Sequence, residues 1–141
     1  MIFGKAEMLR YMRSHRLAVV SSIGANGEPQ SALMGIAVSA RCEVVFDTTT
    51  DTRKHRNLLR DPRAAIVFAG PDEQTLQLEG RARPIALSGA ADADLRSVYY
   101  EVWSEGRDRL KWPNLVYWCI EPKWARYSDF AHGPLIQEFR W

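Results

Sequence analysis

The most informative segment is Thr48-Thr-Thr-Asp-Thr-Arg-Lys-His-Arg-Asn-Leu-Leu-Arg-Asp-Pro62, close to the middle of a chain of 141 residues. Its central part, residues 53–60, predicts a short helix. Asp51 or Thr52 can cap the beginning of this helix, and Pro62 lies just beyond its end. The segment therefore interrupts a chain that is otherwise rich in strand signals.

Three bases lie in or near the first turn of this predicted helix: Arg53, Lys54 and Arg56. A helix N-terminus already carries about half a positive charge, so these cations repel the helix dipole and one another. A bound anion would remove this conflict. Free backbone N–H groups, threonine hydroxyls and bases together are typical of a phosphate-binding site. A solvated basic helix end is the alternative interpretation, and it costs little if the side chains are exposed.

Alternating and β-branched residues predict strands on both sides of this helix. The predicted strands are Leu17–Ile23, Gln30–Ser39, Glu43–Asp47, Ala64–Ala69, Gln74–Ile85, Leu115–Ile120 and Trp124–Tyr127, the last two separated by Pro122. Further helices are expected over Ala6–His15 and Ser88–Trp103. Asn26-Gly27 is a strong hairpin signal, and Gly80 indicates a bulge or bend in its long strand. Strands and helices do not alternate regularly, so a small antiparallel barrel with appended helices is expected.

The composition is that of a globular domain, with 46% hydrophobic and 26% charged residues. The longest uncharged stretch, Pro29–Ala40, is too short and too polar for a membrane span of about 20 apolar residues. Met1–Arg16 lacks the apolar core of a secretory signal, and Cys42 and Cys119 form no CxxC pair. We therefore expect a cytoplasmic protein without a membrane segment. A formal net charge of +2 is too balanced for a general nucleic-acid binder.

The order of these elements resembles that of the FMN-binding split-barrel family, which includes pyridoxamine 5′-phosphate oxidase. The segments that carry the resemblance are Leu17–Ser22, Gly27–Ala32, Val45–Thr48, Thr52–Ala65 and Leu78–Ala82. An Arg-Lys pair followed by Asn-Leu and Asp-Pro, ahead of a strand and Glu-Gly-Arg, is specific as a set. The resemblance implies one flavin-binding domain over residues 1–141. Its fold would be mainly β with appended helices (α+β), a small antiparallel, Greek-key-like split β-barrel.

The resemblance also implies a set of cofactor-binding residues. Arg53 and Lys54 would hold the flavin phosphate, with Thr52 as the preceding hydroxyl residue. The remaining contacts would come from Ser31, Ala32, Leu33 and Met34 along the ring, from Asp47, Thr48 and Thr49 beside the ribityl and phosphate, from Gln77 on the far side of the ring, and from Trp124 or Trp118 of the partner subunit. A homodimer with the flavin at its interface is implied.

A homodimer is also favoured by the closing strands. Val116, Tyr117, Trp118 and Ile120 offer more large apolar surface than the interior of a small barrel should need. We expect an interface to cover this surface.

Two functions remain open at this stage. The first is an FMN-dependent oxidoreductase acting on an unidentified small substrate, in which the flavin does the chemistry. The second is a non-catalytic flavin-binding protein, a carrier or sensor. The resembled family also contains users of F420 and of haem, so these cofactors are alternatives. The end of the chain, Ile136–Trp141, lacks the Arg- and His-containing substrate motif of pyridoxamine 5′-phosphate oxidase itself, which argues against vitamin oxidation.

Other chemistry has less support in the sequence. His15 and His132 have no second ligand at metal spacing, so no metal site is predicted. His55 lies beside the bases and could contact a phosphate, although such a histidine is more often simply exposed. Nucleic-acid binding through Arg53–Arg63 is disfavoured because that basic run contains no aromatic residue. Catalytic residues are not identified.

Overall fold

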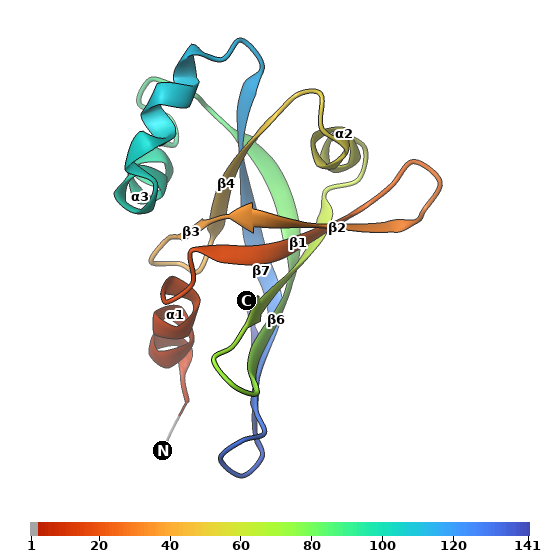
Figure 1. Ribbon diagram of the computed structural model, residues 1–141, viewed down its shortest axis with the longest axis vertical. Helices are drawn as coiled ribbons and strands as arrows, with labels where there is room; N and C mark the ends of the chain where they lie inside the picture. Colours follow the sequence, from red (N-terminus) through yellow and green to blue (C-terminus); the bar gives the residue numbers. More distant parts are fainter. Residues whose placement is uncertain (1–2) are drawn as a thin grey trace.

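An antiparallel sheet of eight strands curls into a half-barrel in the computed structural model, which describes residues 3–141 (Figure 1). The strand order is β2-β1-β5-β6-β7-β4-β3, with β8 paired to β7. The strands are β1 (Leu17–Ile23), β2 (Pro29–Gly35), β3 (Ala37–Val38), β4 (Val44–Thr49), β5 (Arg63–Ala69), β6 (Gln74–Ile85), β7 (Leu115–Asp129) and β8 (Leu135–Arg140). The helices are α1 (Lys5–Arg13), α2 (Arg53–Arg60), α3 (Ala93–Val102) and the 3₁₀ segment η1 (Ser104–Lys111). The predicted antiparallel barrel with appended helices is confirmed.

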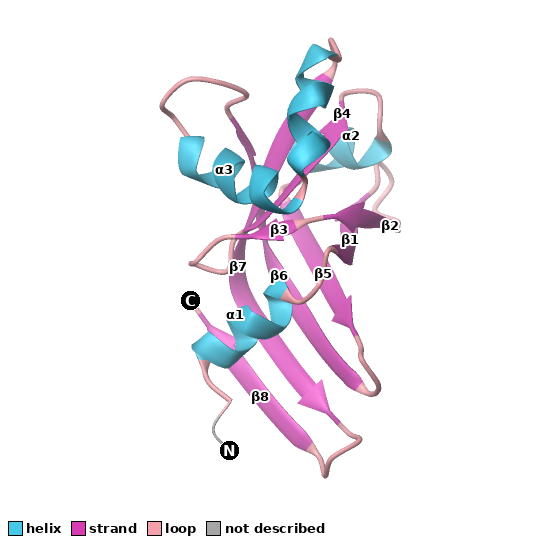
Figure 2. Ribbon diagram, turned by 60° about the vertical axis from the view of Figure 1, so that its left-hand side comes forward, coloured by secondary structure: helices cyan, strands magenta, loops and turns pink. Residues whose placement is uncertain are grey.

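The helices cover different parts of this sheet. Figure 2 shows α1 lying across the long strands, while α2 and α3 lie toward the opposite end. Helix α1 seals the barrel interior with Met8 and Met12, which are fully buried. No helix within residues 3–141 has both the length and the apolar character needed to cross a bilayer.

Strand β7 contributes to two separate cores because its successive side chains point to opposite faces. Trp118 and Ile120 belong to the core inside the barrel, and Tyr117 and Cys119 to the core beneath α3. All four side chains are at most 1% exposed. The expectation that Val116, Tyr117, Trp118 and Ile120 form an outward apolar surface is therefore wrong. Val116 is partly buried against the barrel core. The sequence pattern did not reveal the second core beneath α3, which takes up the other face of this strand.

The two predicted closing strands are in fact one, since β7 continues through Pro122. Pro122 lies opposite Gly80, where the pairing of β6 with β7 shifts register. A side chain at position 80 would collide with the carbonyl oxygen of Glu121. The predicted irregularity at Gly80 is confirmed, and it is a bulge that accommodates both the close backbone approach and a residue without an N–H group.

Several other boundaries shift by one or two residues, and two elements differ more strongly from the prediction. The strand expected over Gln30–Ser39 is interrupted at Ile36, between β2 and β3. Helix α3 begins only at Ala93, because the buried guanidinium of Arg96 holds the preceding loop open. It donates hydrogen bonds to the carbonyl oxygens of Ala86, Ala91 and Gly89, at 2.8, 2.7 and 2.5 Å. Strand β8 was not predicted; within residues 3–141 it pairs with β7 alone.

Candidate functional site

Helix α2 begins at the predicted position, and threonine hydroxyls fix its start. The Oγ1 atom of Thr52 accepts a hydrogen bond from the backbone N–H of His55 at 3.4 Å and lies 3.0 Å from the Oγ1 atom of Thr48. Thr52 also donates to the carbonyl oxygen of Thr49 at 3.0 Å. The hydroxyls of Thr48 and Thr52 are therefore committed to holding the β4–α2 connection, directly beside the predicted phosphate site.

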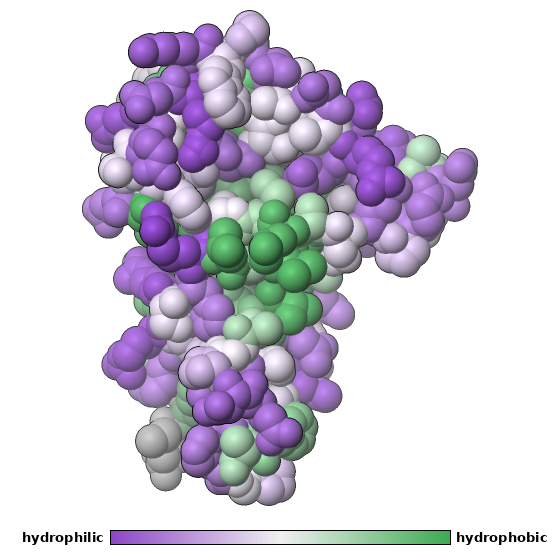
Figure 3. All heavy atoms as spheres, in the orientation of Figure 1, coloured by the Kyte–Doolittle hydropathy of each residue, from purple (hydrophilic) through white to green (hydrophobic). Residues whose placement is uncertain are grey.

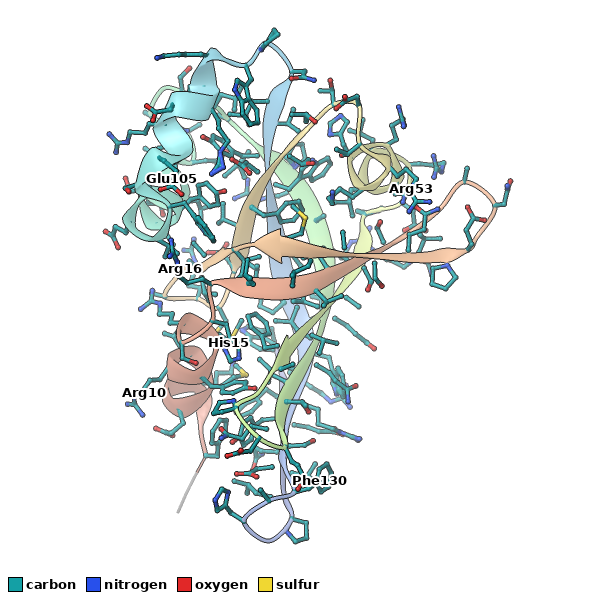
Figure 4. The ribbon with its side chains drawn as sticks, in the orientation of Figure 1. Arg10, His15, Arg16, Arg53, Glu105 and Phe130 are labelled. Atoms are coloured by element: carbon teal, nitrogen blue, oxygen red, sulfur yellow. The ribbon has the colours of Figure 1, made fainter. Side chains whose placement is uncertain are left out.

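The first turn of α2 opens onto a cavity beside the β1–β2 hairpin. This cavity has a volume of about 110 Å³ and is lined by Val20, Ser22, Gln30, Ser31, Ala32, Arg53 and Lys54. Figure 4 shows Arg53 extending from α2 toward the hairpin. The volume is well below the roughly 300–1,000 Å³ that hold drug-sized ligands, so the cavity suits one end of a larger molecule. We call it the anion cleft.

The anion cleft holds two cations, and no carboxylate is among the described residues that line it. Within residues 3–141, neither Arg53 nor Lys54 forms an ion pair. Burial, and next the charge of Arg53, lower the pKa of Lys54 below its usual range. Both effects disfavour the charged ammonium in the free protein, and the charge of a bound anion would offset them. The helix dipole adds to this preference for an anion.

A hydrogen-bond network that the sequence did not reveal fixes the wall of the anion cleft. The buried Asn57 on α2 donates from Nδ2 to the hydroxyl of Ser22 at 3.0 Å and to Oε1 of Gln30 at 2.9 Å. Arg60 donates to Oδ1 of the same amide at 3.0 Å. The helix is thereby tied to β1 and β2. One feature of the sequence could have indicated this network. Ser22 occupies an inward position of a strand whose other inward residues, Ala18 and Val20, are apolar.

The remaining predicted residues on β2, β6 and β7 separate according to the two faces of the sheet. Cross-strand pairing places two rows of side chains on the outer face of the sheet. One row contains Ser31, Ser21, Ala65, Glu79 and Trp124. The other contains Leu33, Val19, Val67 and Gln77. Leu33, Gln77 and Trp124 thus share the outer face of the barrel. Ala32 and Met34 point to the other face, Ala32 into the anion cleft and Met34 against the barrel core.

A larger groove of about 420 Å³ lies on the outer face and shares Ser22 with the anion cleft. Its lining also includes Ser21, Ile23, Pro29, Arg63, Ala64, Ala65, Glu79, Gly80 and Lys123. We call it the outer groove. The hydroxyls of Ser21 and Ser31 lie 2.8 Å apart at the boundary between groove and cleft. Gln77 and Trp124 line neither cavity, so their predicted contacts with a cofactor stay predictions.

Asp47 and Thr49 do not face the anion cleft. The carboxylate of Asp47 lies toward α3 and η1, with one oxygen 3.3 Å from Nε of Arg109. Burial raises the pKa of this carboxyl, and the charge of Arg109 offsets part of that rise. Thr49 donates to Asp51 at 2.5 Å. Consecutive side chains of a strand point to opposite faces, so Asp47 and Thr48 cannot both be directed at one site.

Comparison with known proteins bears on the family. A family model described as pyridoxamine 5′-phosphate oxidase matches residues 5–129. No match is found among curated protein sequences.

Solved structures share the fold at low sequence identity. A haem-binding protein from Mycobacterium smegmatis superposes with a TM-score of 0.80 at 15% identity, covering 99% of this chain but 60% of that one. A pyridoxamine 5′-phosphate oxidase-related, FMN-binding protein from Nostoc punctiforme gives 0.69 at 16%, covering 96% and 93%. A protein from Clostridium acetobutylicum related to general stress protein 26 gives 0.72 at 18%, covering 96% and 92%. The match over residues 5–129 confirms the resemblance: the chain belongs to the pyridoxamine 5′-phosphate oxidase family.

Proposed function

We propose that the protein binds FMN and acts as an FMN-dependent oxidoreductase on a small substrate. The observation that carries this proposal is the pair of cations Arg53 and Lys54 at the N-terminus of α2, in a cleft of about 110 Å³, neither of which forms an ion pair within residues 3–141. A phosphate monoester has the charge and the size that this cleft favours. Family membership and the FMN-binding Nostoc neighbour support the same cofactor.

Different residues of the site would bind different parts of FMN. Arg53 and Lys54 would hold the phosphate, and Gln30 and Ser31 would offer hydrogen-bonding groups beside them. The outer groove offers a larger space next to the cleft for the remainder of the molecule. When bound, FMN supplies the redox chemistry, so the protein's part is binding, orientation and electrostatics. This division agrees with the small number of acid–base side chains in the two cavities.

The lining residues favour FMN over haem. Protein ligands to haem iron are usually His, Cys, Met or Tyr. None of these types is among the described residues that line the anion cleft or the outer groove. His15, on the neighbouring surface, has its two ring nitrogens against carbonyl oxygens of Tyr11 and Ala69, at 2.9 and 3.1 Å. F420 also carries a phosphate, and identification of the released cofactor separates it from FMN.

We further propose that a second copy of the chain covers the outer face. Leu17, Val19, Leu33 and Val67 form an apolar patch across β1, β2 and β5, and three of them, Leu17, Leu33 and Val67, are 49, 65 and 40% exposed. Figure 3 shows this face as a continuous hydrophobic area at the centre of the view. The patch lies beside the outer groove, so a homodimer through it would enclose the flavin ring. Such a patch on a small protein usually marks an interface.

We also propose that the protein is cytoplasmic. Cys42 and Cys119 are both buried free thiols, which suits a reducing compartment such as the cytoplasm.

Two measurements test the function. The absorption spectrum of the purified protein, with mass spectrometry of the released cofactor, should show FMN. A haem Soret band or the mass of F420 would overturn the cofactor assignment. Anaerobic mixing of the FMN-loaded protein with NADH or NADPH then separates the two classes of function. Rapid bleaching of the flavin supports an oxidoreductase, whereas flavin that stays oxidised with either donor supports the carrier or sensor.

A further inference from the structure

A hydrogen bond ties the first turn of α2 to the buried core of the barrel. The indole of Trp118 on β7 is 1% exposed, and its Nε1–H donates to Nδ1 of His55 at 3.2 Å. The two rings meet edge to face, with centroids 5.6 Å apart and an interplanar angle of 65°. His55 directly follows Lys54 and is itself partly buried. The contact therefore links the core to the turn that carries the cations of the anion cleft.

This bond constrains the chemical state of His55. An indole N–H is a donor only, so Nδ1 of His55 must offer its lone pair, and the ring proton must be on Nε2. A protonated imidazole would place an N–H against the indole N–H and leave a buried donor without an acceptor. Leaving such a group unsatisfied is costly.

The surroundings of His55 also favour the neutral ring. Burial, and next the charge of Arg56, lower the pKa of His55. The charged groups on its own helix are all cations: Arg53, Lys54, Arg56 and Arg60. From β7 it meets the uncharged Trp118, and from β4 the hydroxyl of Thr48 lies near its turn through Thr52. The acid on β4, Asp47, is directed toward Arg109. Within residues 3–141, His55 forms no ion pair with a carboxylate that would stabilise an imidazolium.

We propose that His55 is a positioning residue for the anion cleft, which anchors the first turn of α2 to Trp118 and does so only as the neutral imidazole. Acidification would then release the turn that presents Arg53 and Lys54. The anchor itself follows from the structure of the free protein. Its consequence for phosphate binding rests on the proposed function.

The first test needs no cofactor. In the wild type, the indole N–H resonance of Trp118, assigned by its loss in Trp118→Phe, should shift as His55 titrates. The folded pKa of His55 is lowered, so the unfolded state binds more protons between the two pKa values. The contribution of His55 to stability should therefore be constant above about pH 6.5, the usual histidine pKa. It should fall as the pH drops from there to the folded value and be level again below that value.

His55→Asn is the matched control, because its amide oxygen can replace Nδ1 as the acceptor but does not titrate. In this variant the Trp118 resonance should stay constant with pH, and the acid-dependent loss of stability should be smaller than in the wild type. His15 and His132 are present in both proteins and cancel in the comparison. An unchanged pH profile in His55→Asn would overturn the proposal.

The second test concerns the ligand and compares the ratio of riboflavin to FMN dissociation constants. His55→Asn should keep the wild-type ratio, whereas Trp118→Phe and His55→Leu should lower it about tenfold, as loss of one charge-assisted bond would. A wild-type ratio in a folded Trp118→Phe protein contradicts the positioning role. If the wild type binds both ligands equally, the proposed function fails, while the resonance and stability tests still decide the anchor.

Discussion

Removing both cations of the anion cleft should weaken FMN binding far more than riboflavin binding. The change is Arg53→Ala together with Lys54→Ala. FMN differs from riboflavin by its phosphate, which is anionic near neutral pH. Both side chains line the cleft and are free of carboxylate partners in the part of the chain that the structure describes, so their charges are available to the phosphate.

The magnitude follows from the two charge-assisted hydrogen bonds that the double variant cannot form. Each hydrogen bond to a charged group contributes about 1.5–3 kcal/mol. Because Arg53 is exposed and Lys54 half-buried, water screens part of this interaction, and the lower limit for two such bonds, about 3 kcal/mol, is appropriate. At about 1.4 kcal/mol per factor of ten, FMN affinity should fall roughly 100-fold. Riboflavin affinity should change less than threefold.

Fluorescence titration of both ligands against wild type and variant is the assay. A matched control is Arg10→Ala with Lys111→Ala, which removes the same charge from exposed positions outside the cleft and should leave the riboflavin-to-FMN ratio close to that of the wild type. Urea unfolding should show the cleft variant to be as stable as wild type or slightly more so, since cations at a helix N-terminus are unfavourable. Equal losses for FMN and riboflavin would refute the phosphate assignment.

Three further outcomes are expected. Gly80→Ala should lower the free energy of unfolding by about 2 kcal/mol or more in urea titration, because its Cβ would collide with the Glu121 carbonyl oxygen; unchanged stability would mean that the bulge relaxes freely. Cys42 and Cys119 should react with a thiol reagent only after unfolding, since burial raises the pKa of both thiols, that of Cys119 to about 12; reaction of the native protein would contradict their burial. Leu33→Asp should convert the proposed homodimer into a monomer in analytical ultracentrifugation while leaving the fold intact, because it places a charge in the apolar patch; a dimer that persists would place the interface elsewhere.

The elements that the sequence predicted well are those decided by local interactions. Helix α2 begins at Arg53 and ends at Arg60 because Thr52 caps it and Pro62 follows it. Strands β1 and β6 have the predicted bounds, and Gly80 lies at the predicted irregularity. The position of Arg53 and Lys54 at a helix N-terminus was also predictable, because helix polarity follows from chain direction alone.

Contacts between groups that are distant in the sequence depend on the packed fold. No local pattern shows that Asn57 bonds to Ser22 and Gln30, or that the indole of Trp118 reaches His55, 63 positions away in the chain. Strand β7 continues through Pro122 because Gly80 on β6 supplies a bulge opposite it. The cationic helix end and the strands around it follow from the sequence alone, because they depend on neighbouring residues. The cleft exists only because the register of the sheet brings β1 and β2 against α2, and register is set by packing of the whole barrel.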